Sequence, residues 1–506
     1  MPTINSIVNK LMLRRIPQIE NFMKNPIDVQ QKVFQNLILS AKDTIWGKFY
    51  DYSSITNQRI YNERVPLNDY NSLLPFFNRI IKGEQNVLCN SDIKWFSKSS
   101  GTTSTRSKFI PVSEESLQEC HYKGGKDMLA LYCNNHPDSQ IFSGYSLALG
   151  GSRQEATNDD IFCGDVSAII IDNLPFWAEW YRVPKKEIAL MPDWDTKLKK
   201  MIESVSVTNI SSLSGVPSWM LMLLEGVMAY TNKSIEEVWP NIEVYFHGGV
   251  SFNPYRKQYQ QILPKTMNYM ETYNASEGFF GLQDRTDDDS LLLLLDYGIY
   301  YEFIPFEDLD KEDKKIIPLS DVELNKNYAM VISTNGGLWR YMIGDTISFT
   351  EIAPYRFKIT GRTKSYINAC GEELIVDNAD KAISKACRQT NSSVVEYTAC
   401  PLFDKPNNRT LHQWVIEFEK EPQDMDDFIT RLDTCLQEVN SDYQAKRYKD
   451  MILKKPMVNV VPKNTFYLWL KDKGSLGGQH KIPRLSNDRK YVEQILSVGS
   501  TDWHSC

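Results

Sequence analysis

A short polar segment, residues 99–108, holds a dense group of side chains that could bind phosphate. Its sequence is Ser-Ser-Gly-Thr-Thr-Ser-Thr-Arg-Ser-Lys. Hydroxyl groups and exposed backbone N–H groups donate hydrogen bonds to a polyphosphate, and Arg or Lys adds counter-charge. A polar loop between two strands has a similar composition, because Ser and Thr are common in loops. The segment alone is therefore compatible with a phosphate-binding loop or an ordinary surface loop.

The residues around this segment argue against a Walker phosphate loop. That motif needs the spacing G-x-x-x-x-G-K-[ST] and a helix directly after it. Here Gly101 has no second glycine at that spacing, and Phe109–Val112 has the pattern of a strand that contains a proline. We therefore expect strand–loop–strand, which disfavours a P-loop NTPase and favours another nucleotide-binding architecture.

Three further segments combine glycine, acidic and aromatic residues after strand-like runs; they are residues 247–250, 273–278 and 339–345. Paired glycines after a strand let the backbone approach a ligand closely, although a simple turn uses them too. Glu277 at a strand end suits Mg²⁺ beside phosphates, but a solvated glutamate is the common alternative. Asp345 follows a glycine and can accept ribose hydroxyls or form an Asx turn.

Two segments near the C-terminus could move. Residues 361–368 have the sequence Gly-Arg-Thr-Lys-Ser-Tyr-Ile-Asn, which suits a hinge or an ordinary interdomain linker. Residues 474–485 form a glycine-rich cationic stretch that includes Lys481 and Arg484. Taken alone, this stretch would be a solvated loop. A lysine there could also act as a compact charge beside a reacting phosphate.

Taken together, these segments resemble the adenylate-forming enzymes, which include acyl-CoA synthetases, luciferases and peptide-synthetase adenylation domains. The closer resemblance is to the auxin-responsive Gretchen Hagen family of acyl acid–amido synthetases, in a bacterial-type form. The matching motifs are Ser-Ser-Gly-Thr-Thr, the Gly-Gly pair, Tyr-x-x-Ser-Glu, Arg-x-x-x-Gly-Asp, the Gly-Arg hinge and Lys-x-Pro-Arg, in the family's order. Thr105 stands where plant members usually carry glycine, and Trp339 replaces a more usual tyrosine.

The resemblance implies an ATP-dependent ligase. It would adenylate a small carboxylic acid and then pass the acyl group to an amine, expected to be an amino acid, releasing pyrophosphate and AMP. ATP and Mg²⁺ are the implied cofactors, with Glu277 as the metal ligand and Glu277 and Lys481 as the catalytic residues. The implied nucleotide-binding residues are Ser99, Ser100, Gly101, Thr102, Thr103, Lys108, Gly248, Gly249, Val250, Tyr273, Asn274, Ala275, Ser276, Asp345 and Arg362.

The acyl pocket is less clear from the residues. The resemblance places substrate-lining residues near the apolar stretch that begins at residue 216, and the candidates are Val216, Trp219, Met220 and Tyr300. Methionine and aromatic residues at helical spacing more often belong to a core. Two other functions stay open: an acyl-CoA ligase with a thiol acceptor, and a non-catalytic nucleotide-binding homologue. An apolar pocket would favour an aromatic or aliphatic acid.

The composition of the chain argues against some classes of binding partner. The chain of 506 residues is 42% hydrophobic and 24% charged, with a net charge of −7 and no dense basic block. We therefore expect neither nucleic acid nor an anionic membrane as a partner. Nine cysteines without a close pair, and an N-terminal segment unlike a secretory signal, favour a cytoplasmic protein. Cys120-His121 with Cys133 and His136 lacks the usual zinc-finger spacing, so no zinc is expected.

The order of periodic segments predicts an α/β fold with two domains. Residues 1–85 favour helices, and strand-like runs then alternate with helical stretches as far as residue 349, which is typical of a large sheet with flanking helices. After Gly361 the pattern favours a smaller α+β unit. We expect a large adenylation domain, residues 1–361, and a smaller mobile lid domain, residues 362–506, joined near residues 360–364.

Overall fold

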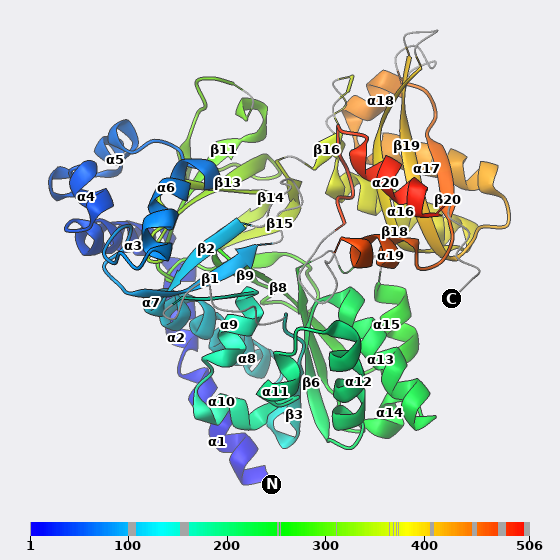
Figure 1. Cartoon of the computed structure of the whole chain (residues 1–506), viewed down its shortest axis with the longest axis horizontal. Coiled ribbons are helices and arrows are strands. Elements are labelled where there is room, and N and C mark those ends of the chain that lie inside the picture. The colour runs from blue at the N-terminus through cyan, green and yellow to red at the C-terminus, as the bar shows by residue number, and fades with distance from the viewer. Residues whose placement is uncertain are drawn as a thin grey trace.

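The computed structural model describes residues 2–99, 108–151, 161–249, 252, 255–309, 311–363, 365–367, 369–370, 372, 374–404, 409–447, 453–473 and 482–499. Figure 1 shows a broad α/β body and, at its upper right, a smaller group of strands and helices from the C-terminal part of the chain. This mixed arrangement confirms the fold class expected from the sequence.

The N-terminal region is helical, as its composition predicts. Its helices are α1 (Pro2–Leu13), α2 (Ile16–Lys24), α3 (Pro26–Ala41), α4 (Ile45–Phe49), α5 (Gln58–Arg64) and α6 (Tyr70–Ile81). Helix α6 begins with a capping box between Asp69 and Ser72, and it buries Leu73, Phe77 and Ile80 on one face. Proline in the first turn of α2 and α3 suits a helix start, because the missing N–H has no partner there.

The main sheet has twelve strands in the order β12-β11-β13-β14-β15-β10-β9-β8-β7-β6-β3-β5. One half, β5-β3-β6-β7-β8, is parallel, and the other half is antiparallel. The parallel strands are β3 (Tyr145–Ala148), β5 (Arg182–Val183), β6 (Ile210–Gly215), β7 (Val244–Gly248) and β8 (Asn268–Ala275). The antiparallel strands are β9 (Gly278–Leu282), β10 (Leu291–Leu293), β11 (Ile299–Pro305), β12 (Ile317–Pro318), β13 (Asn327–Thr334), β14 (Tyr341–Ile352) and β15 (Tyr355–Arg362).

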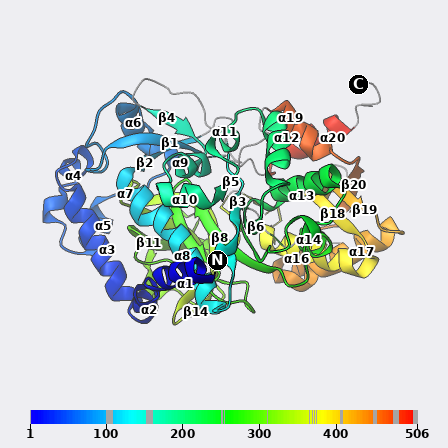
Figure 2. The same ribbon diagram turned by 90° about the horizontal axis from the view of Figure 1, so that it is seen from below.

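Helices connect and cover the parallel strands (Figures 1 and 2). They are α8 (Lys123–Asn135), α9 (Val166–Asp172), α10 (Phe176–Tyr181), α11 (Lys186–Ala189), α12 (Trp194–Val205), α13 (Pro217–Thr231), α14 (Ile235–Val238) and α15 (Arg256–Ile262). Crossover connections of this kind cover the faces of parallel strands. Helix α13 contains most of the apolar stretch that begins at residue 216.

A separate hairpin flanks the polar segment. Strand β1 (Ile93–Ser99) pairs antiparallel with β2 (Lys108–Ser113), and β4 (Phe162–Gly164) adds a third strand beside β1. Ser99 and Lys108 are direct partners at the end of this ladder. The expected strand–loop–strand order is therefore confirmed, and the polar segment joins two paired strands. After β2 come a helical turn, α7 (Glu114–Ser116), and a π-helical turn, η2 (Leu117–Tyr122).

The C-terminal elements have a core of their own. They are β16 (Tyr366–Ile367), β17 (Leu374–Ile375), α16 (Val376–Thr390), β18 (Ser393–Asp404), β19 (Arg409–Lys420), α17 (Met425–Val439), α18 (Ser441–Arg447), β20 (Met457–Val461), α19 (Thr465–Asp472) and α20 (Lys490–Gly499). Trp414, Ile416, Phe428 and Leu432 are buried in this core. Helices and strands both occur here, as the α+β pattern after Gly361 predicts. Strand β15 extends to Arg362, so the first half of the expected linker lies in the main sheet.

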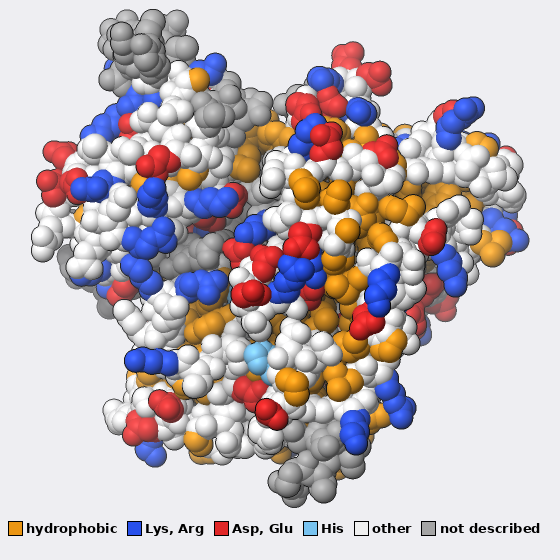
Figure 3. Space-filling view, turned by 180° about the vertical axis from the view of Figure 1, so that it is seen from behind, with side chains coloured by type: hydrophobic (Ala, Val, Ile, Leu, Met, Phe, Trp, Pro, Cys, Tyr) orange, Lys and Arg blue, Asp and Glu red, His pale blue; other side chains and the backbone are white. Residues whose placement is uncertain are grey.

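Within the described ranges, none of the helices has both the length and the apolar character that crossing a bilayer requires. On the face shown in Figure 3, lysine and arginine side chains alternate with aspartate and glutamate side chains, with hydrophobic side chains between them.

Candidate active site

The ends of the parallel strands bring several predicted residues to one edge of the sheet. Gly215 at the end of β6 lies opposite His247 on β7, and Gly248 lies opposite Thr272 on β8. Because parallel strands end at the same edge, Val216 and the turns after β7 and β8 gather there. Strand β1 contacts the same region, because the Ser97 hydroxyl donates to the Ser276 hydroxyl at 2.8 Å.

The two glycines after β7 are required by their surroundings. A Cβ on Gly248 would lie 2.3 Å from the Thr272 carbonyl oxygen, so the two strands touch through backbone. Gly249 has a φ of +85°, a conformation that favours glycine, and a Cβ there would approach Val216 at 3.3 Å. Val216 and Gly249 therefore lie side by side. Val250 falls outside the described residues.

Tyr273, Asp345 and Arg362 form one hydrogen-bonded group. The Tyr273 hydroxyl donates to Asp345 Oδ2, and Arg362 Nε lies 3.1 Å from Asp345 Oδ1. Asp345 and Arg362 are opposite each other in the β14–β15 ladder, which explains their pairing. Tyr273 is 7% exposed, and burial together with the Asp345 charge raises its pKa, so the phenol keeps its proton.

Glu277 occupies the turn between β8 and β9, close to this group. Burial and the negative charge of Asp345 raise the pKa of Glu277, while the positive charges of Lys108 and Arg362 lower it in part. Three other predicted residues, Lys108, Asp345 and Arg362, are thus within electrostatic reach of Glu277. Two carboxylates of like charge in a partly buried site favour the binding of a cation.

The rest of the motif at 273–277 is held by hydrogen bonds. Asn274 Oδ1 lies 3.0 Å from Nδ1 of His121, and burial lowers the His121 pKa to about 4, so this imidazole is neutral at pH 7. Ala275 ends β8 and pairs with Gly278. At the base of the polar loop, the Phe109 N–H donates to the Tyr70 hydroxyl at 3.1 Å, and the Lys108 ammonium lies 5.8 Å from the Tyr70 ring centroid.

Arg340 is not part of this charged group and has a structural role. It forms a buried ion pair with Glu302, at 3.0 Å, and donates to the Val65 carbonyl at 2.8 Å. The arginine of the Arg-x-x-x-Gly-Asp motif thus connects the main sheet to the N-terminal helical region.

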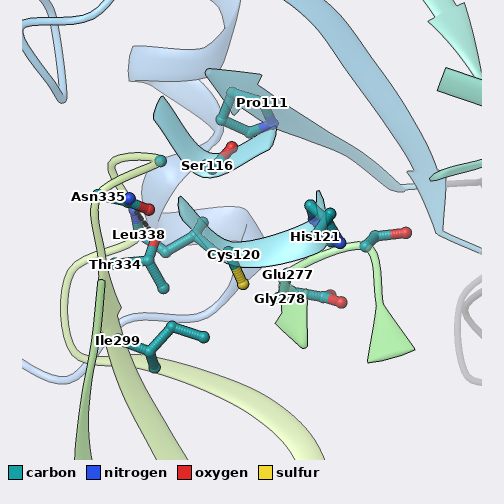
Figure 4. Close-up of a pocket in the computed structure, with 12 residues that line it drawn as sticks. Pro111, Ser116, Cys120, His121, Glu277, Gly278, Ile299, Thr334, Asn335 and Leu338 are labelled. Carbon is teal, nitrogen blue, oxygen red and sulfur yellow. Dashed lines mark hydrogen bonds between the residues drawn. The ribbon is translucent and has the colours of Figure 1, made fainter. Parts of the chain in front are cut away.

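A pocket opens beside Glu277 (Figure 4). Part of its space is open to solvent. It lies between the turn η2, the β8–β9 hairpin and the turn after β13. The lining residues are Pro111, Ser116, Cys120, His121, Ser276, Glu277, Gly278, Ile299, Thr334, Asn335, Gly336 and Leu338. The sequence interpretation missed most of them; it considered Cys120-His121 only as part of a zinc site, which it rejected.

The predicted acyl-pocket residues lie elsewhere. Trp219 packs against Trp194 with ring centroids 4.5 Å apart, and Met220 is fully buried in the core beneath α13. Tyr300 is buried with its ring 5.0 Å from Phe34, on the side of the N-terminal helices. Val216 is adjacent to Gly249 and so is close to the strand ends. These four assignments stay predictions.

Several predicted residues cannot be placed. Side-chain contacts of Ser99 lie outside the described part of the chain, as do Ser100, Gly101, Thr102, Thr103 and Lys481. The segment after Lys481 is described. Its Arg484 forms ion pairs with Asp380 at 2.6 Å and Glu396 at 3.2 Å, and Leu485 bridges to Ala399 on β18. The residues that follow Lys481 are therefore fixed to the C-terminal sheet.

Three family models match the chain in order along its length. They are the GH3 family N-terminal domain over residues 15–267, the GH3 family central domain over residues 292–362 and the GH3 family C-terminal domain over residues 377–490. The chain belongs to the GH3 family. This membership confirms the resemblance drawn from the motifs.

Individual GH3 relatives are similar over nearly the whole chain. An indole-3-acetic acid-amido synthetase, GH3.4 of Arabidopsis thaliana, is 23% identical, with 92% of this chain and 90% of that protein covered. The solved structure of the GH3.15 acyl acid amido synthetase has a TM-score of 0.77 at 16% identity and covers 95% of both chains. A 2-hydroxyisobutyryl-CoA ligase in its postadenylation state has a TM-score of 0.56 at 12% identity, covering 97% of this chain and 92% of that one.

Proposed function

We propose that this GH3 chain is an ATP-dependent acyl acid–amido synthetase. It adenylates a small carboxylic acid and then transfers the acyl group to an amine, which we expect to be an amino acid. The observation that carries the proposal is the meeting of Lys108, Glu277, Asp345 and Arg362 at the edge where the parallel strands end. Relatives named as amido synthetases support the same chemistry.

Each predicted residue has a role in this proposal. The Asp345 carboxylate binds the ribose hydroxyls, while Tyr273 and Arg362 orient it. The Gly248–Gly249 turn, with Val250, forms a wall for the adenine ring. Residues 99–103 and Lys108 bind the phosphates of ATP, because hydroxyl, N–H and ammonium groups donate hydrogen bonds to phosphate oxygens.

Magnesium fits this site. The Glu277 pKa is raised by burial and by Asp345, and a cation beside these two carboxylates would offset their repulsion. Glu277 would hold the ion, since a carboxylate oxygen is a ligand that Mg²⁺ prefers. When bound, Mg²⁺ offsets negative charge on the phosphates. Lys481 supplies positive charge beside the α-phosphate, so the substrate carboxylate can attack that phosphorus and displace pyrophosphate.

We also propose two domains, residues 1–361 and residues 362–506, with rotation near residues 363 and 364 between the two half-reactions. The separate hydrophobic core of the C-terminal elements supports this division. The Thr363 N–H donates to the Gly344 carbonyl at 2.8 Å, next to Asp345. A rotation at this point would therefore act directly on the ribose-binding carboxylate.

Transfer to coenzyme A is the second candidate function. The structural similarity to a CoA ligase favours it, although that similarity is lower than the similarity to the amido synthetase. Both functions share the adenylation step, so they differ only in the acceptor.

The test is pyrophosphate release from MgATP with a panel of small acids. Each acid is incubated with amino acids, with coenzyme A or with neither, and the products are identified by mass. We expect AMP and an amide with one acid and an amino acid. A thioester would assign the chain to the CoA branch. ATP binding without pyrophosphate release from any acid would contradict both candidates.

A further inference from the structure

The turn that follows β3, residues 149–151, lies at the edge where the predicted site residues gather. Strand β3 is parallel to β6, so both strands end at this edge. A Cβ on Gly215, at the end of β6, would lie 2.8 Å from the Leu149 Cβ. Leu149 is thus beside Gly215 and Val216, and Val216 in turn is beside Gly249. Turn 149–151 therefore continues the row of turns that follow β7 and β6.

Lys197 of helix α12 holds this turn. Its ammonium group donates to the Gly150 carbonyl at 2.7 Å and to the Gly151 carbonyl at 3.1 Å. The residue is 0% exposed, which is rare for a lysine. Burial lowers the Lys197 pKa to about 8, and the Asp165 charge raises it in part, so the amine is mostly protonated at pH 7. Hydrogen bonds from a charged donor are stronger than those from a neutral one.

The turn is also packed closely on its other side. A Cβ on Gly151 would lie 1.9 Å from Asp165 Oδ2, and a Cβ on Gly150 would lie 2.5 Å from Ile171 Cδ1. The Gly151 N–H donates to the Ser167 hydroxyl at 2.8 Å. The backbone of the turn therefore lies between helices α9 and α12, and both glycines are needed for this close approach.

Helix α12 supports the start of α13 as well. Trp194 packs against Trp219 of α13, and the Lys197 ammonium lies 6.0 Å from the Trp194 ring centroid. Other side chains of α12 share a hydrophobic core with β3 and β6 (Figure 1). A side chain that only filled this core would need no charge, because burying an ammonium group costs free energy. The charge of Lys197 is accounted for by the two carbonyl groups that it binds.

We infer that Lys197 is a positioning residue for the bound acid. It fixes turn 149–151, which forms one wall of the acyl site together with Val216. Ligands of open α/β sheets bind outside the carboxyl ends of the strands. The turn after β7 is assigned to adenine, so the neighbouring turns after β6 and β3 are left for the acid. This inference rests on the proposed function, because it concerns the acid that the ligase activates.

The experiment uses the full-length protein with benzoate, phenylacetate, butyrate and hexanoate. Pyrophosphate release gives kcat, KM for the acid and KM for ATP, and the shift in Tm with each acid, without ATP, gives binding. Lys197→Met removes the charge and the donors at a similar side-chain length. Lys200→Met replaces an exposed lysine of the same helix. Val205→Ala, at a fully buried position of α12, is the control for a general loss of stability.

We expect Lys197→Met to raise KM for the acid by about 10-fold or more, because the released turn no longer holds the acid in place. KM for ATP should stay at the wild-type value, since the residues proposed to bind ATP do not include Lys197. Lys200→Met and Val205→Ala should keep both KM values, although Val205→Ala lowers the Tm. An equal rise in both KM values for Lys197→Met would overturn the inference. The same rise in KM for the acid in Val205→Ala would also overturn it.

Ser167→Ala tests the turn from its other side and decides the question if Lys197→Met does not fold. It removes the hydroxyl that accepts from the Gly151 N–H. One neutral hydrogen bond contributes about 1 kcal/mol, so KM for the acid should rise about 5-fold with KM for ATP unchanged. An unchanged KM for the acid in Ser167→Ala would overturn the inference.

The two readouts separate this inference from the proposed function. If no acid releases pyrophosphate, the proposed function fails, and the Tm shifts still decide the binding claim. An acid that raises the Tm of the wild-type protein more than that of Lys197→Met or Ser167→Ala supports the role of turn 149–151. Equal Tm shifts in wild type and variants contradict it, as does the absence of a shift with every acid.

Discussion

Asp345 and Arg362 face each other across the β14–β15 ladder, and Arg362 Nε lies 3.1 Å from Asp345 Oδ1. Arg362 is the last residue of β15, directly before the proposed hinge. The Asp345 carboxylate also accepts a hydrogen bond from Tyr273 on β8. Asp345, the residue proposed to bind the ribose, is therefore connected to the strand that leads to Glu277. It is also connected to the point where the small domain would rotate.

Tyr273→Phe should weaken the use of ATP while the protein stays folded. The substitution removes the hydroxyl that donates to Asp345, and a hydrogen bond to a charged group contributes about 1.5–3 kcal/mol. We expect KM for ATP to rise about 10-fold or more in pyrophosphate-release assays. Tyr301→Phe is the matched control, since it also removes a buried hydroxyl, one that donates to the Leu294 carbonyl away from Asp345. Equal KM values for the two variants would contradict the role of Tyr273.

Glu277→Gln should lower activity but not stability. Burial and Asp345 raise the Glu277 pKa, so its charged form opposes folding, and a neutral side chain removes that cost. We expect at least about 100-fold slower pyrophosphate release, with a higher Mg²⁺ requirement, at an unchanged or higher Tm.

Glu271→Gln is the control for this change. Glu271 lies on β8, the strand that leads to Glu277, and burial followed by the Asp289 charge raises its pKa to about 7. This variant should show the same gain in Tm at pH 8 and keep its activity. Full activity of Glu277→Gln at low Mg²⁺ would remove Glu277 from the proposed metal site.

Arg484→Lys should slow adenylation through the segment that carries Lys481. Arg484 lies within hydrogen-bond distance of both Asp380 and Glu396, and lysine cannot reproduce this forked arrangement. We expect about 10-fold lower kcat with little change in KM for ATP, because the loop holding Lys481 would be less well positioned.

Arg447→Lys tests whether weakening another buried ion pair of the small domain would also lower kcat. Arg447 pairs with Asp433 at 2.7 Å and is similarly buried. Its replacement should lower the Tm and leave kcat unchanged. If both variants lose kcat equally, the cause is a general loss of stability. Arg484 would then not position the loop that holds Lys481.

The burial of His121 predicts that the stability of the protein depends on pH. Burial lowers its pKa from 6.5 to about 4, so the unfolded chain binds a proton that the folded protein does not bind between these values. Stability is therefore highest above about pH 6.5 and is lost as the pH falls toward 4, by up to about 3 kcal/mol from this group.

The measurement is urea unfolding between pH 4 and 7.5. His121→Gln should unfold with a flatter pH profile than the wild-type protein, by up to one proton. His136→Gln, which replaces a half-buried histidine of the same region, should keep the wild-type profile. Parallel profiles for His121→Gln and wild type would mean that His121 is not held neutral by burial.

Much of the fold follows from local sequence signals. Alternating strand-like and helical runs predict the α/β class, and the proline-containing run at 109–112 predicts a strand in place of the helix that a Walker motif needs. These signals are local because a strand or helix depends on periodicity and on nearby proline and glycine. The last helix, α20, was missed although it has a buried apolar face.

The motifs also determined the family and the expected chemistry, because backbone turns and charged groups around a nucleotide demand particular residue types at fixed positions. Only the tertiary structure decided which side chains share the site. The Arg340–Glu302 pair, the Tyr273–Asp345 hydrogen bond and the pocket at Asn335 each join residues that are distant in sequence. Such contacts depend on strand order and register, which periodicity does not encode. For this reason the sequence specified the reaction more closely than it specified the acid.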